Sequence, residues 1–439
     1  MATGDYAKLL SDGTTTGVGG VLFTDRRNWY IDPQTYTELW TSVTPFISGL
    51  MSRAGSRRDL ADPLFKLFEH RNPWQKQELV TTTAATIGND DNADALTISS
   101  GTGLPAYAAA NNAFLGLVFE VWNSTKTTRR GVGICTAVGA GTISLKNLST
   151  TSMTTVSGDI LVCIGHLSGE AEVAPEAWSD ELVVVWGSTG IIRTTVEVSG
   201  TLLQASLRGA NKELERLRAQ KLQQHKLHQE RLFMRGHSML GTNMDAGGTF
   251  ADNWRTDANS RKIRSSMGVI TAIETYGATS GDYQNVFDKT GGMSFNDWVD
   301  ITEKVFQYLP MSGIKDFYCG PRAMSYWSKI DAEGKLRTGF SVSLSELKSD
   351  TLGVNFRILE TPFGVARLIY TPSLKREYQN YMIYITPENL FHAVYRPLKY
   401  FTNILTDNNP DLVKDEYMSD EGVGMTLIES HGIIKLPVA

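Results

Sequence analysis

The spacing of hydrophobic and polar residues changes along the chain and predicts a different kind of element in each part. From Thr81 to Ile160, short apolar runs are separated by Thr, Ser and Gly, a pattern that favours strands joined by turns. From about Leu202 to Arg235, apolar residues recur at steps of three and four, which is typical of a helix. Beyond Gly236, short strand patterns and helix patterns alternate. This order predicts a mixed α+β protein.

The long helix has recognisable ends in the sequence. Ser199 or Thr201 can cap its first turn, and Gly236 is placed to end it. A helix of this length spans about 50 Å, which is longer than a small domain is wide. Four leucines of its apolar stripe are expected to pack the helix against a sheet. They are Leu203, Leu207, Leu214 and Leu217.

Two further strand patterns flank the β-rich region. Leu64–Glu69 precedes it and Leu182–Trp186 follows it. The β-rich region is therefore predicted to be inserted into a hairpin whose two arms leave and return to one place. We expect the hairpin at residues 61–85 and 178–200, and the inserted domain at residues 86–177.

The second half of the chain carries several local signals. Ser294 and Asp297 form a capping box for a helix that continues to Val305. Pro321 can open another helix, and the turn Thr361–Gly364 predicts a hairpin. The strands predicted here are Ile314–Cys319, Val354–Thr361, Val365–Tyr370, Tyr381–Ile385, Leu390–Tyr395 and Gly424–Ile428.

Residues 1–60 do not contain enough apolar sequence for a core of their own. They include a Gly/Thr stretch and a helix-like piece from Asp32 to Met51, and they read as an arm that becomes ordered by lying on other parts of the structure. Near its end stand Arg53, Arg57 and Arg58, which could touch nucleic-acid phosphates without reading sequence.

Composition excludes several classes of protein. With 42 Lys+Arg and 47 Asp+Glu, the net charge is −5, so the chain is not a basic nucleic-acid-binding domain as a whole. The three cysteines are far apart, which argues against a disulfide framework or a zinc module. We find no secretory signal and no apolar run that could span a membrane, so folding in a cytoplasm is expected.

Candidate catalytic and metal-binding patterns are weak. His225-x-x-His228 places two imidazoles within one helical turn, but a third metal ligand at a supporting spacing is missing. A solvated or interface face among neighbouring Lys and Arg residues is favoured there. Ser238 lies in Gly236–Gly241, which has one residue too many for a nucleophile elbow and follows a helix instead of a strand.

The glycine-rich stretches are better explained as turns and tight strand contacts, and the acidic stretches as surface turns. Gly131–Gly133 and Gly139–Gly141 have no helix after them that could hold a phosphate. The acidic clusters Asn89–Asp94 and Asp407–Asp411 lack the glycine and the terminal Glu of a calcium-binding loop. No catalytic residue, metal or cofactor is therefore expected.

The order of the predicted parts resembles that of the HK97-type major capsid proteins of tailed bacteriophages. An arm, a long hairpin, a very long helix and a mixed α+β domain follow one another in both, and the branch with a β insertion in the hairpin is the most similar. Several stretches carry this resemblance. They are Ser42–Phe46, Phe68–Asn72, Ser157–Val162, Val196–Thr201, Tyr395–Pro397 and Glu421–Gly432.

The resemblance implies an HK97-like fold. Its parts would be the N-terminal arm, the hairpin called the E-loop with its inserted β domain, a peripheral domain with the long spine helix, and an axial domain. In this sequence we expect the arm at 1–60, the E-loop and insertion at the residues given above, the peripheral domain at 201–265 with parts of 340–375 and 416–439, and the axial domain at 266–415.

The resemblance also implies a function. The chain would be a non-enzymatic major head protein of the virion, assembled in the host cytoplasm into hexamers and pentamers around double-stranded DNA. Portal protein, and decoration and scaffolding proteins, would be further partners, with no membrane involved. The insertion is expected on or near the capsid exterior. An encapsulin-like shell around cargo protein remains an alternative, as does, in another class, a β-rich receptor-binding module or hydrolase.

Overall fold

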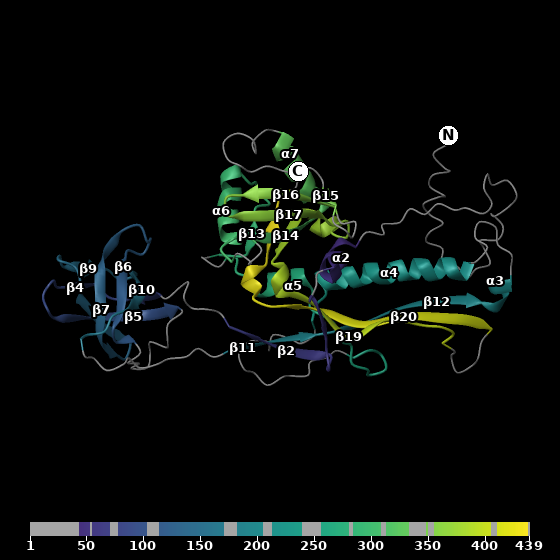
Figure 1. Ribbon diagram of the computed structural model, residues 1–439, viewed down its shortest axis with the longest axis horizontal. Coiled ribbons are helices and arrows are strands. Elements are labelled where there is room, and N and C mark those ends of the chain that lie inside the picture. The colour runs from purple at the N-terminus through teal and green to yellow at the C-terminus, as the bar shows by residue number, and fades with distance from the viewer. Residues whose placement is uncertain are drawn as a thin grey trace. The chain divides into compact units, whose positions relative to one another are not determined.

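The computed structural model describes residues 44–52, 55–70, 78–102, 114–170, 182–204, 213–238, 256–280, 284–308, 313–332, 348–349, 355–404 and 411–437. The chain divides into two compact units (Figure 1). One contains Met1–Leu67 and Val184–Ala439, and the other contains Phe68–Val183. The predicted insertion of one part of the chain into another is thus present.

The unit of Phe68–Val183 is a closed β-barrel with antiparallel neighbours in the order β10-β3-β5-β8-β7-β6. Its core is made of buried apolar side chains that alternate along the strands, such as Leu79, Phe119 and Leu145. The barrel strands are β3 (Glu78–Thr81), β5 (Ala93–Thr102), β6 (Leu117–Trp122), β7 (Arg129–Gly139), β8 (Thr142–Asn147) and β10 (Ile160–His166), and β4 (Ala85–Ile87) pairs with β9 (Met153–Thr155).

The barrel corrects one predicted boundary. β3 was expected to belong to the hairpin at 61–85, yet it pairs with β5 and β10 inside the barrel. Closure of the barrel requires a strand between these two, and the short run Glu78–Thr81 supplies it. The glycines at 139–141 form the β7–β8 turn as predicted, and Gly141 has φ of +72°, in the left-handed region that favours glycine.

A four-stranded sheet runs through the other unit in the order β1-β19-β20-β12. Its strands are β1 (Arg57–Asp59), β12 (Gly190–Ser199), β19 (Leu390–Phe401) and β20 (Leu412–Met425). β12 alternates strictly between buried and exposed residues and pairs with β20 along all of its length, from Gly190↔Glu421 to Ser199↔Leu412. The sheet therefore has one face that must be covered.

Two predictions for this sheet are wrong. Residues 190–199 were assigned to the hairpin at 178–200, but β20 takes them up as an edge strand of the sheet. The strand predicted at Gly424–Ile428 is in fact the end of the much longer β20, and Ile428 lies in a short 3-10 helix, η6 (Ile428–Ser430). Acidic residues in β20 conceal the strand pattern, because they are buried in ion pairs.

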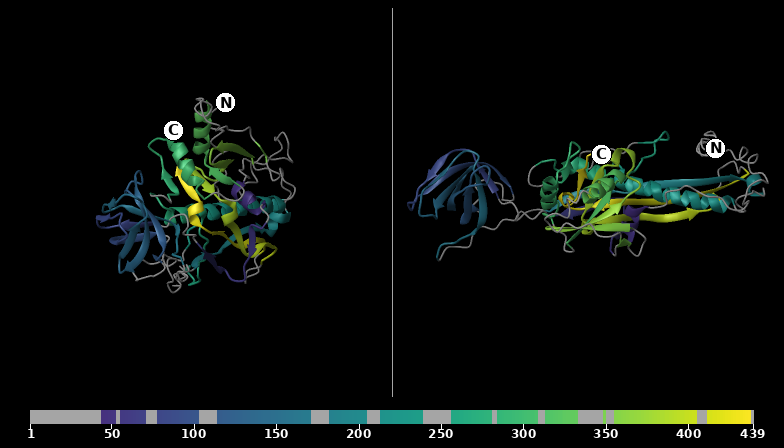
Figure 2. Two further views of the ribbon diagram at one scale, coloured as in Figure 1. Left: turned by 60° about the vertical axis from the view of Figure 1, so that its left-hand side comes forward. Right: turned by 90° about the horizontal axis from the view of Figure 1, so that it is seen from above.

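The predicted long helix is described as α3 (Gly200–Gln204) and α4 (Glu213–Arg235), with residues 205–212 outside the described part. The Ser199 hydroxyl accepts a hydrogen bond from the Leu202 amide at 3.4 Å, and α4 ends immediately before Gly236, both as predicted. α4 lies along β12 and β20 (Figure 2). In the part of the chain that the structure describes, no helix is long and apolar enough to cross a membrane.

A seven-stranded mixed sheet forms the middle layer of the same unit, in the order β13-β21-β18-β14-β17-β16-β15. Its strands are β13 (Val286–Asp288), β14 (Ile314–Cys319), β15 (Lys348–Ser349), β16 (Asn355–Thr361), β17 (Gly364–Tyr370), β18 (Tyr381–Ile385) and β21 (Gly432–Lys435). Part of 340–375 was predicted to lie in the other domain, with the spine helix. β16 and β17 belong to the seven-stranded sheet, where β17 pairs with β14, and which part of 340–375 lies with the spine helix stays a prediction.

Helices cover both faces of this sheet. Phe317 of β14 packs into a core with α6 (Phe295–Val305) and α7 (Pro321–Ala332). Tyr318, the next residue, packs into a second core with α2 (Pro45–Ser52), α5 (Val269–Tyr276) and the end of α4. This alternation is what a strand between two layers requires.

Several local predictions for this region are confirmed. The Ser294–Asp297 capping box is formed, and α6 ends at Val305. α7 begins at Pro321, and the Thr361–Gly364 turn joins β16 to β17. Two short 3-10 helices, η4 (Arg376–Tyr378) and η5 (Pro387–Asn389), complete the connections.

A two-stranded ribbon leads to the barrel and back. β2 (Leu64–Glu69) pairs with β11 (Val183–Ser188), which matches the two hairpin arms that the sequence predicts. Phe65 stacks edge-on against Phe391 of β19 at 5.8 Å. Gly187 lies against the Phe65 ring so closely that a side chain there would collide with it.

Candidate functional site

Helix α4 presents polar side chains to the four-stranded sheet. The His225 ring is fully buried, with Nδ1 at 3.0 Å from the Thr194 hydroxyl and Nε2 at 3.0 Å from the Ser419 hydroxyl. Burial lowers the pKa of His225, and nearby Glu421 partly opposes this. Because both ring nitrogens are bonded to hydroxyls on two neighbouring strands, His225 fixes the position of the helix on the sheet.

Glu421 of β20 extends this contact. His392 Nε2 lies 3.1 Å from its carboxylate, and Gln229 of α4 donates a hydrogen bond to the same oxygen. All three side chains are buried. A buried carboxylate is tolerated only when hydrogen-bonded or paired, so this arrangement joins α4, β19 and β20 in one position. We call His225, Gln229, Thr194, Ser419, Glu421 and His392 the polar seam.

Asp415 secures the other end of α4 to the sheet. Its carboxylate accepts hydrogen bonds from Arg218 at 2.8 Å, from the Tyr400 hydroxyl at 2.7 Å and from the Asn403 amide at 2.9 Å. Burial acts to raise the pKa of Asp415, but these donors together lower it below its ordinary value. On the opposite face of β20, Glu416 forms a two-pronged ion pair with Arg193 of β12.

Asp420 is fully buried and gathers three donors from different segments. It accepts hydrogen bonds from Thr189 at 2.7 Å, from Arg264 at 2.6 Å and from Arg396 at 3.1 Å. These residues belong to the β11–β12 connection, to the segment before α5 and to β19. One carboxylate therefore holds the start of β12 and the approach to α5 on the sheet.

Two backbone segments approach each other closely where α4 ends and α5 begins. The Gly268 amide donates to the Gly236 carbonyl at 2.8 Å, and a side chain on Gly268 would meet backbone atoms of Gly236 at 2.4 Å. The glycine at each position thus permits a close approach that a side chain would prevent.

Helix α2 and strand β1 are the elements described in the predicted arm, and α2 lies on the rest of its unit. Phe46, Ile47 and Leu50 are buried in the core that contains Phe233 of α4 and Tyr318 of β14. Phe46 contacts the Tyr318 ring edge-on at 5.2 Å. This agrees with the expectation that the arm gains order by lying on other elements.

A buried carboxyl group faces the start of α2. Glu230 of α4 accepts a hydrogen bond from Ser373 at 2.9 Å. Burial raises its pKa to about 7, against the opposing effects of the Ser373 hydroxyl and of the backbone amides of Ile47 and Phe46. Glu230 is therefore largely protonated in slightly acidic solution in the folded protein but not in the unfolded chain.

The free energy of unfolding is expected to fall as pH rises from about 4.5 to about 7, because the folded subunit holds the Glu230 proton that the unfolded chain releases. The interval corresponds to about 3 kcal/mol. Glu230→Gln removes this titration and should flatten that part of the curve. Urea unfolding of dissociated subunits at several pH values measures it, and parallel curves for the two proteins would contradict the assignment.

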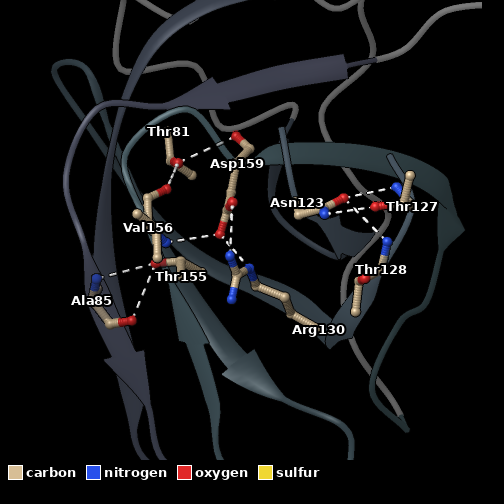
Figure 3. Close-up of polar contacts among 9 residues, drawn as sticks. All are labelled: Thr81, Ala85, Asn123, Thr127, Thr128, Arg130, Thr155, Val156 and Asp159. Atoms are coloured by element: carbon tan, nitrogen blue, oxygen red, sulfur yellow. Dashed lines mark hydrogen bonds and ion pairs between the residues drawn. The ribbon is translucent and has the colours of Figure 1, made fainter. Parts of the chain in front are cut away.

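One end of the barrel is held by an ion pair between the buried Asp159 and the partly exposed side chain of Arg130 (Figure 3). Asp159 accepts a hydrogen bond from the Val156 amide at 2.7 Å and pairs with Arg130 at 2.6 Å. The Thr81 hydroxyl donates to the Val156 carbonyl at 2.8 Å. Asp159 is buried, so the loop between β9 and β10 is held by contacts to both β3 and β7.

A second polar turn lies at the same end. The Asn123 side-chain oxygen accepts hydrogen bonds from the Thr127 and Thr128 amides at 2.8 and 3.1 Å, which closes the β6–β7 connection (Figure 3). Such side-chain to backbone bonds are typical of Asn in turns. The acidic cluster Asn89–Asp94 connects β4 to the first residues of β5, and the Asp94 carboxylate accepts a hydrogen bond from the Gly88 amide at 2.9 Å.

The four leucines predicted to pack the helix are placed differently from one another. Leu203 is 39% exposed on α3, Leu214 and Leu217 are partly buried on α4, and Leu207 lies outside the described residues. Their role in packing stays a prediction. The side chains of α4 that are buried are His225, Gln229, Glu230, Phe233 and Met234.

The three predicted DNA-facing arginines are also placed in part. Arg57 pairs with Asp59 at 2.8 Å on the surface, and Arg58 lies over the Phe391 ring at 4.2 Å. Arg53 lies outside the described residues. Contact with DNA at these positions stays a prediction.

The candidate catalytic and metal-binding residues make structural contacts in the folded chain. The expected solvated or interface face is wrong for His225, which belongs to the polar seam. Ser238 is buried in the segment after α4, where its hydroxyl lies 3.5 Å from that of Ser188. The structure groups no three His, Cys, Asp or Glu side chains as metal ligands in the ranges that it describes. Of the cluster 407–411, only Asp411 is described.

Sequence reasoning missed the polar seam. A signal was present, because His225, Gln229 and Phe233 recur at four-residue steps on one stripe of the helix. Polar residues on such a stripe are more often exposed than buried, so the sequence pattern favours the leucines as the residues that pack the helix.

A family model, curated proteins and solved structures were compared with the chain. Residues 41–403 match the family described as SU10 major capsid protein. No curated protein matches the chain. Among solved structures, the chain is similar to a capsid chain of the native GTA particle, with a TM-score of 0.44 and 9% identity over 94% of this chain and 97% of that chain.

Two further structures are similar at the same low identity. One is from Mycobacterium phage Adephagia, with a TM-score of 0.40 and 10% identity over 100% of this chain and 99% of that chain. The other is the holo-SrpI encapsulin complex from Synechococcus elongatus PCC 7942, with a TM-score of 0.37 and 9% identity over 58% of this chain and 77% of that chain.

The family match covers most of the chain, including α2, the barrel, α4 and much of both sheets of the larger unit. The resemblance to phage major capsid proteins that the sequence carries is confirmed. The chain belongs to the SU10 major capsid protein family and is a head protein of tailed phages that assembles with copies of itself into the shell of the virion.

Proposed function

We propose that this head protein forms the hexamers and pentamers of an icosahedral shell around packaged double-stranded DNA, and that it catalyses no reaction. One observation carries the proposal: the β2–β11 ribbon is incomplete by itself. Phe65 packs on the four-stranded sheet, but Phe68 of β2 is 68% exposed and Leu182, immediately before β11, is 56% exposed, so the ribbon leaves large apolar side chains uncovered. Another copy of the chain is the partner that could cover such a ribbon at every position of a shell.

Closed shells form readily from moderate contacts. A standard interface buries about 1,600 Å², and its net strength is modest after the entropy of association. Several such contacts per subunit act together, so the shell is durable while a misplaced subunit can still leave. The ribbon, the arm and the barrel give one subunit several separate surfaces for such contacts.

We assign the remaining parts by the same proposal. The four-stranded sheet with α4 corresponds to the peripheral domain, and the seven-stranded sheet corresponds to the axial domain. The barrel lies on or near the exterior of the shell, where it contacts neighbouring subunits or a decoration protein. Assembly takes place in the host cytoplasm, with a portal protein at one vertex and a scaffolding protein as a further partner.

The non-enzymatic assignment is supported by the fate of the candidate catalytic groups. Both nitrogens of the His225 ring form hydrogen bonds with hydroxyl groups of the sheet. Ser238 is buried, and α4 precedes it where a nucleophile elbow needs a strand. Turnover that disappears in a His228→Ala or Ser238→Ala variant would favour a hydrolase instead.

Expression of the full chain tests the proposal directly. Negative-stain microscopy and sedimentation should find shells or capsomers, and antibodies against the barrel should label intact particles from outside. A chain that stays monomeric under all conditions would refute self-assembly. Copurified nucleic acid supports a head protein, whereas a copurified cargo protein would indicate an encapsulin-like compartment.

A further inference from the structure

One side of α4 carries four polar residues that make no contact with the sheet among the described interactions. Lys221, Gln224, His228 and Arg231 follow one another at steps of three, four and three, so they lie on one side of the helix. With about 100° per residue, the four residues span about 80° of the helix circumference, beside the side that carries the buried His225 and Gln229. Arg231 is exposed, and the other three are partly exposed. We call these four residues the basic stripe.

Among the described residues, the positive charges of the basic stripe have no carboxylate partner, whereas Arg216 and Arg218 of α4 do. Arg216 pairs with Glu213, and Arg218 pairs with Asp415. By contrast, neither Lys221 nor Arg231 forms an ion pair with a carboxylate among the described residues, and the Lys221 ammonium donates only to the neutral side chain of Gln224, at 2.9 Å.

His228 lies beside the two cations of the basic stripe. Its pKa is lowered by partial burial and then by the positive charges of Arg231 and Lys221. A neutral imidazole with two cations beside it still has one N–H to donate. The stripe therefore offers donors and excess positive charge to an anion, on a chain whose net charge is −5.

We propose that the basic stripe binds the phosphate backbone of the packaged nucleic acid, without reading its sequence. This inference rests on the proposed function, which places nucleic acid inside the shell. Lys221 and Arg231 are ten residues apart, which is about 15 Å along the helix. Phosphates on one strand of B-DNA advance by about 3.4 Å each, so the two cations reach different phosphates of the same duplex.

The inference differs from the contact predicted for the arm. Arg57 and Arg58 are already engaged by Asp59 and by the Phe391 ring, whereas the cations of the basic stripe have no comparable partner among the described residues. Arginine can bind a phosphate through two parallel hydrogen bonds, and lysine acts as a point charge. A sequence-independent backbone contact requires no more than this.

The test is the salt dependence of binding between unassembled full-length protein and a short DNA duplex. For each phosphate contact, the slope of log affinity against log salt changes by about 0.9. Lys221→Gln combined with Arg231→Gln should therefore reduce the slope by about 1.8 and weaken binding roughly equally for duplexes of unrelated sequence. Lys221→Arg should retain the slope of the natural protein.

Lys226→Gln is the matched control, because it removes the same charge from the same helix. Lys226 is exposed but lies about 140° around the helix from Lys221. The slope should stay unchanged in this variant. If the slope falls by about 0.9, the amount expected for one lost phosphate contact, only net charge matters and the basic stripe is not the site.

Shell formation by the same variants separates this inference from the proposed function. Normal shells together with a reduced salt slope support the stripe as a nucleic-acid contact. Normal shells with an unchanged slope overturn the stripe and leave the shell function intact. Lost shells with unchanged DNA binding would also overturn it, since the stripe would then face an acidic protein surface.

Discussion

Replacing Asp420 by alanine is expected to lower the free energy of unfolding by about 3–5 kcal/mol, the range for breaking a buried ion pair from one side. The carboxylate accepts hydrogen bonds from Thr189, Arg264 and Arg396. The side chain of Arg264 is largely buried and would keep its charge without a counterion. Since the same carboxylate holds the start of β12, the variant should also fail to form shells.

Denaturant unfolding of dissociated subunits measures the loss. Asp59→Ala is the control, because Asp59 forms its ion pair with Arg57 on the surface. Exposed pairs contribute less than about 1 kcal/mol, so this variant should unfold like the natural protein. Asp420→Asn keeps the shape and loses the charge, and it should fall between the two. An Asp420→Ala variant as stable as Asp59→Ala would disprove the role assigned to this carboxylate.

Replacing Phe233 by alanine is expected to cost a similar amount, about 3–5 kcal/mol, because it leaves a cavity in a core. Phe233 is buried where α4 meets α2, α5 and both sheets of its unit. Its ring also lies 5.6 Å from that of His392 in the polar seam. Loss of this side chain should loosen the helix from the sheet and release the arm helix α2.

The neighbouring Leu232 provides the control for Phe233. It is 41% exposed on the same helix, so Leu232→Ala removes a large apolar side chain without creating a buried cavity. That variant should lose less than about 1 kcal/mol, a small effect typical of surface positions. Thermal or urea unfolding that ranks Leu232→Ala at or below Phe233→Ala in stability would show that the core is not where the structure places it.

Elements defined by a local signal were predicted well. The β14 strand Ile314–Cys319, the capping box of α6 and the Pro321 start of α7 agree with the structure. Each depends on residues within a few positions of one another: an apolar run, a Ser with its Asp three residues later, or a Pro whose missing amide is not needed in a first turn. Such signals are complete in the sequence.

Elements defined by distant partners were predicted poorly. In the sequence, the acidic half of β20 resembles a surface segment. In the folded chain its carboxylates pair with Arg193, Arg218 and Arg264, which come from other parts of the chain. β12 reads as part of a hairpin until β20 pairs with it. Burial of a charge depends on a counterion that sequence distance does not reveal, so these strands could not be assigned locally.

The ribbon and the polar seam show the same difference between local signals and distant partners. The two ribbon strands were visible as apolar runs on either side of the β-rich region, and they pair as expected. The polar seam was not predicted, because its His, Gln, Glu, Thr and Ser side chains resemble exposed residues in the sequence. Only the exact fit of donors and acceptors between α4 and the sheet allows them to be buried.

By itself, the sequence determined the order of the parts: an arm, a strand that leaves, a β-rich insertion, a strand that returns, a long helix and a mixed α+β region. Periodicity and turn residues encode that order, and they act over a few positions along the chain. The tertiary structure alone decided which strands share a sheet and which polar groups are buried, since hydrogen bonds and ion pairs between distant segments are made only when the chain has folded.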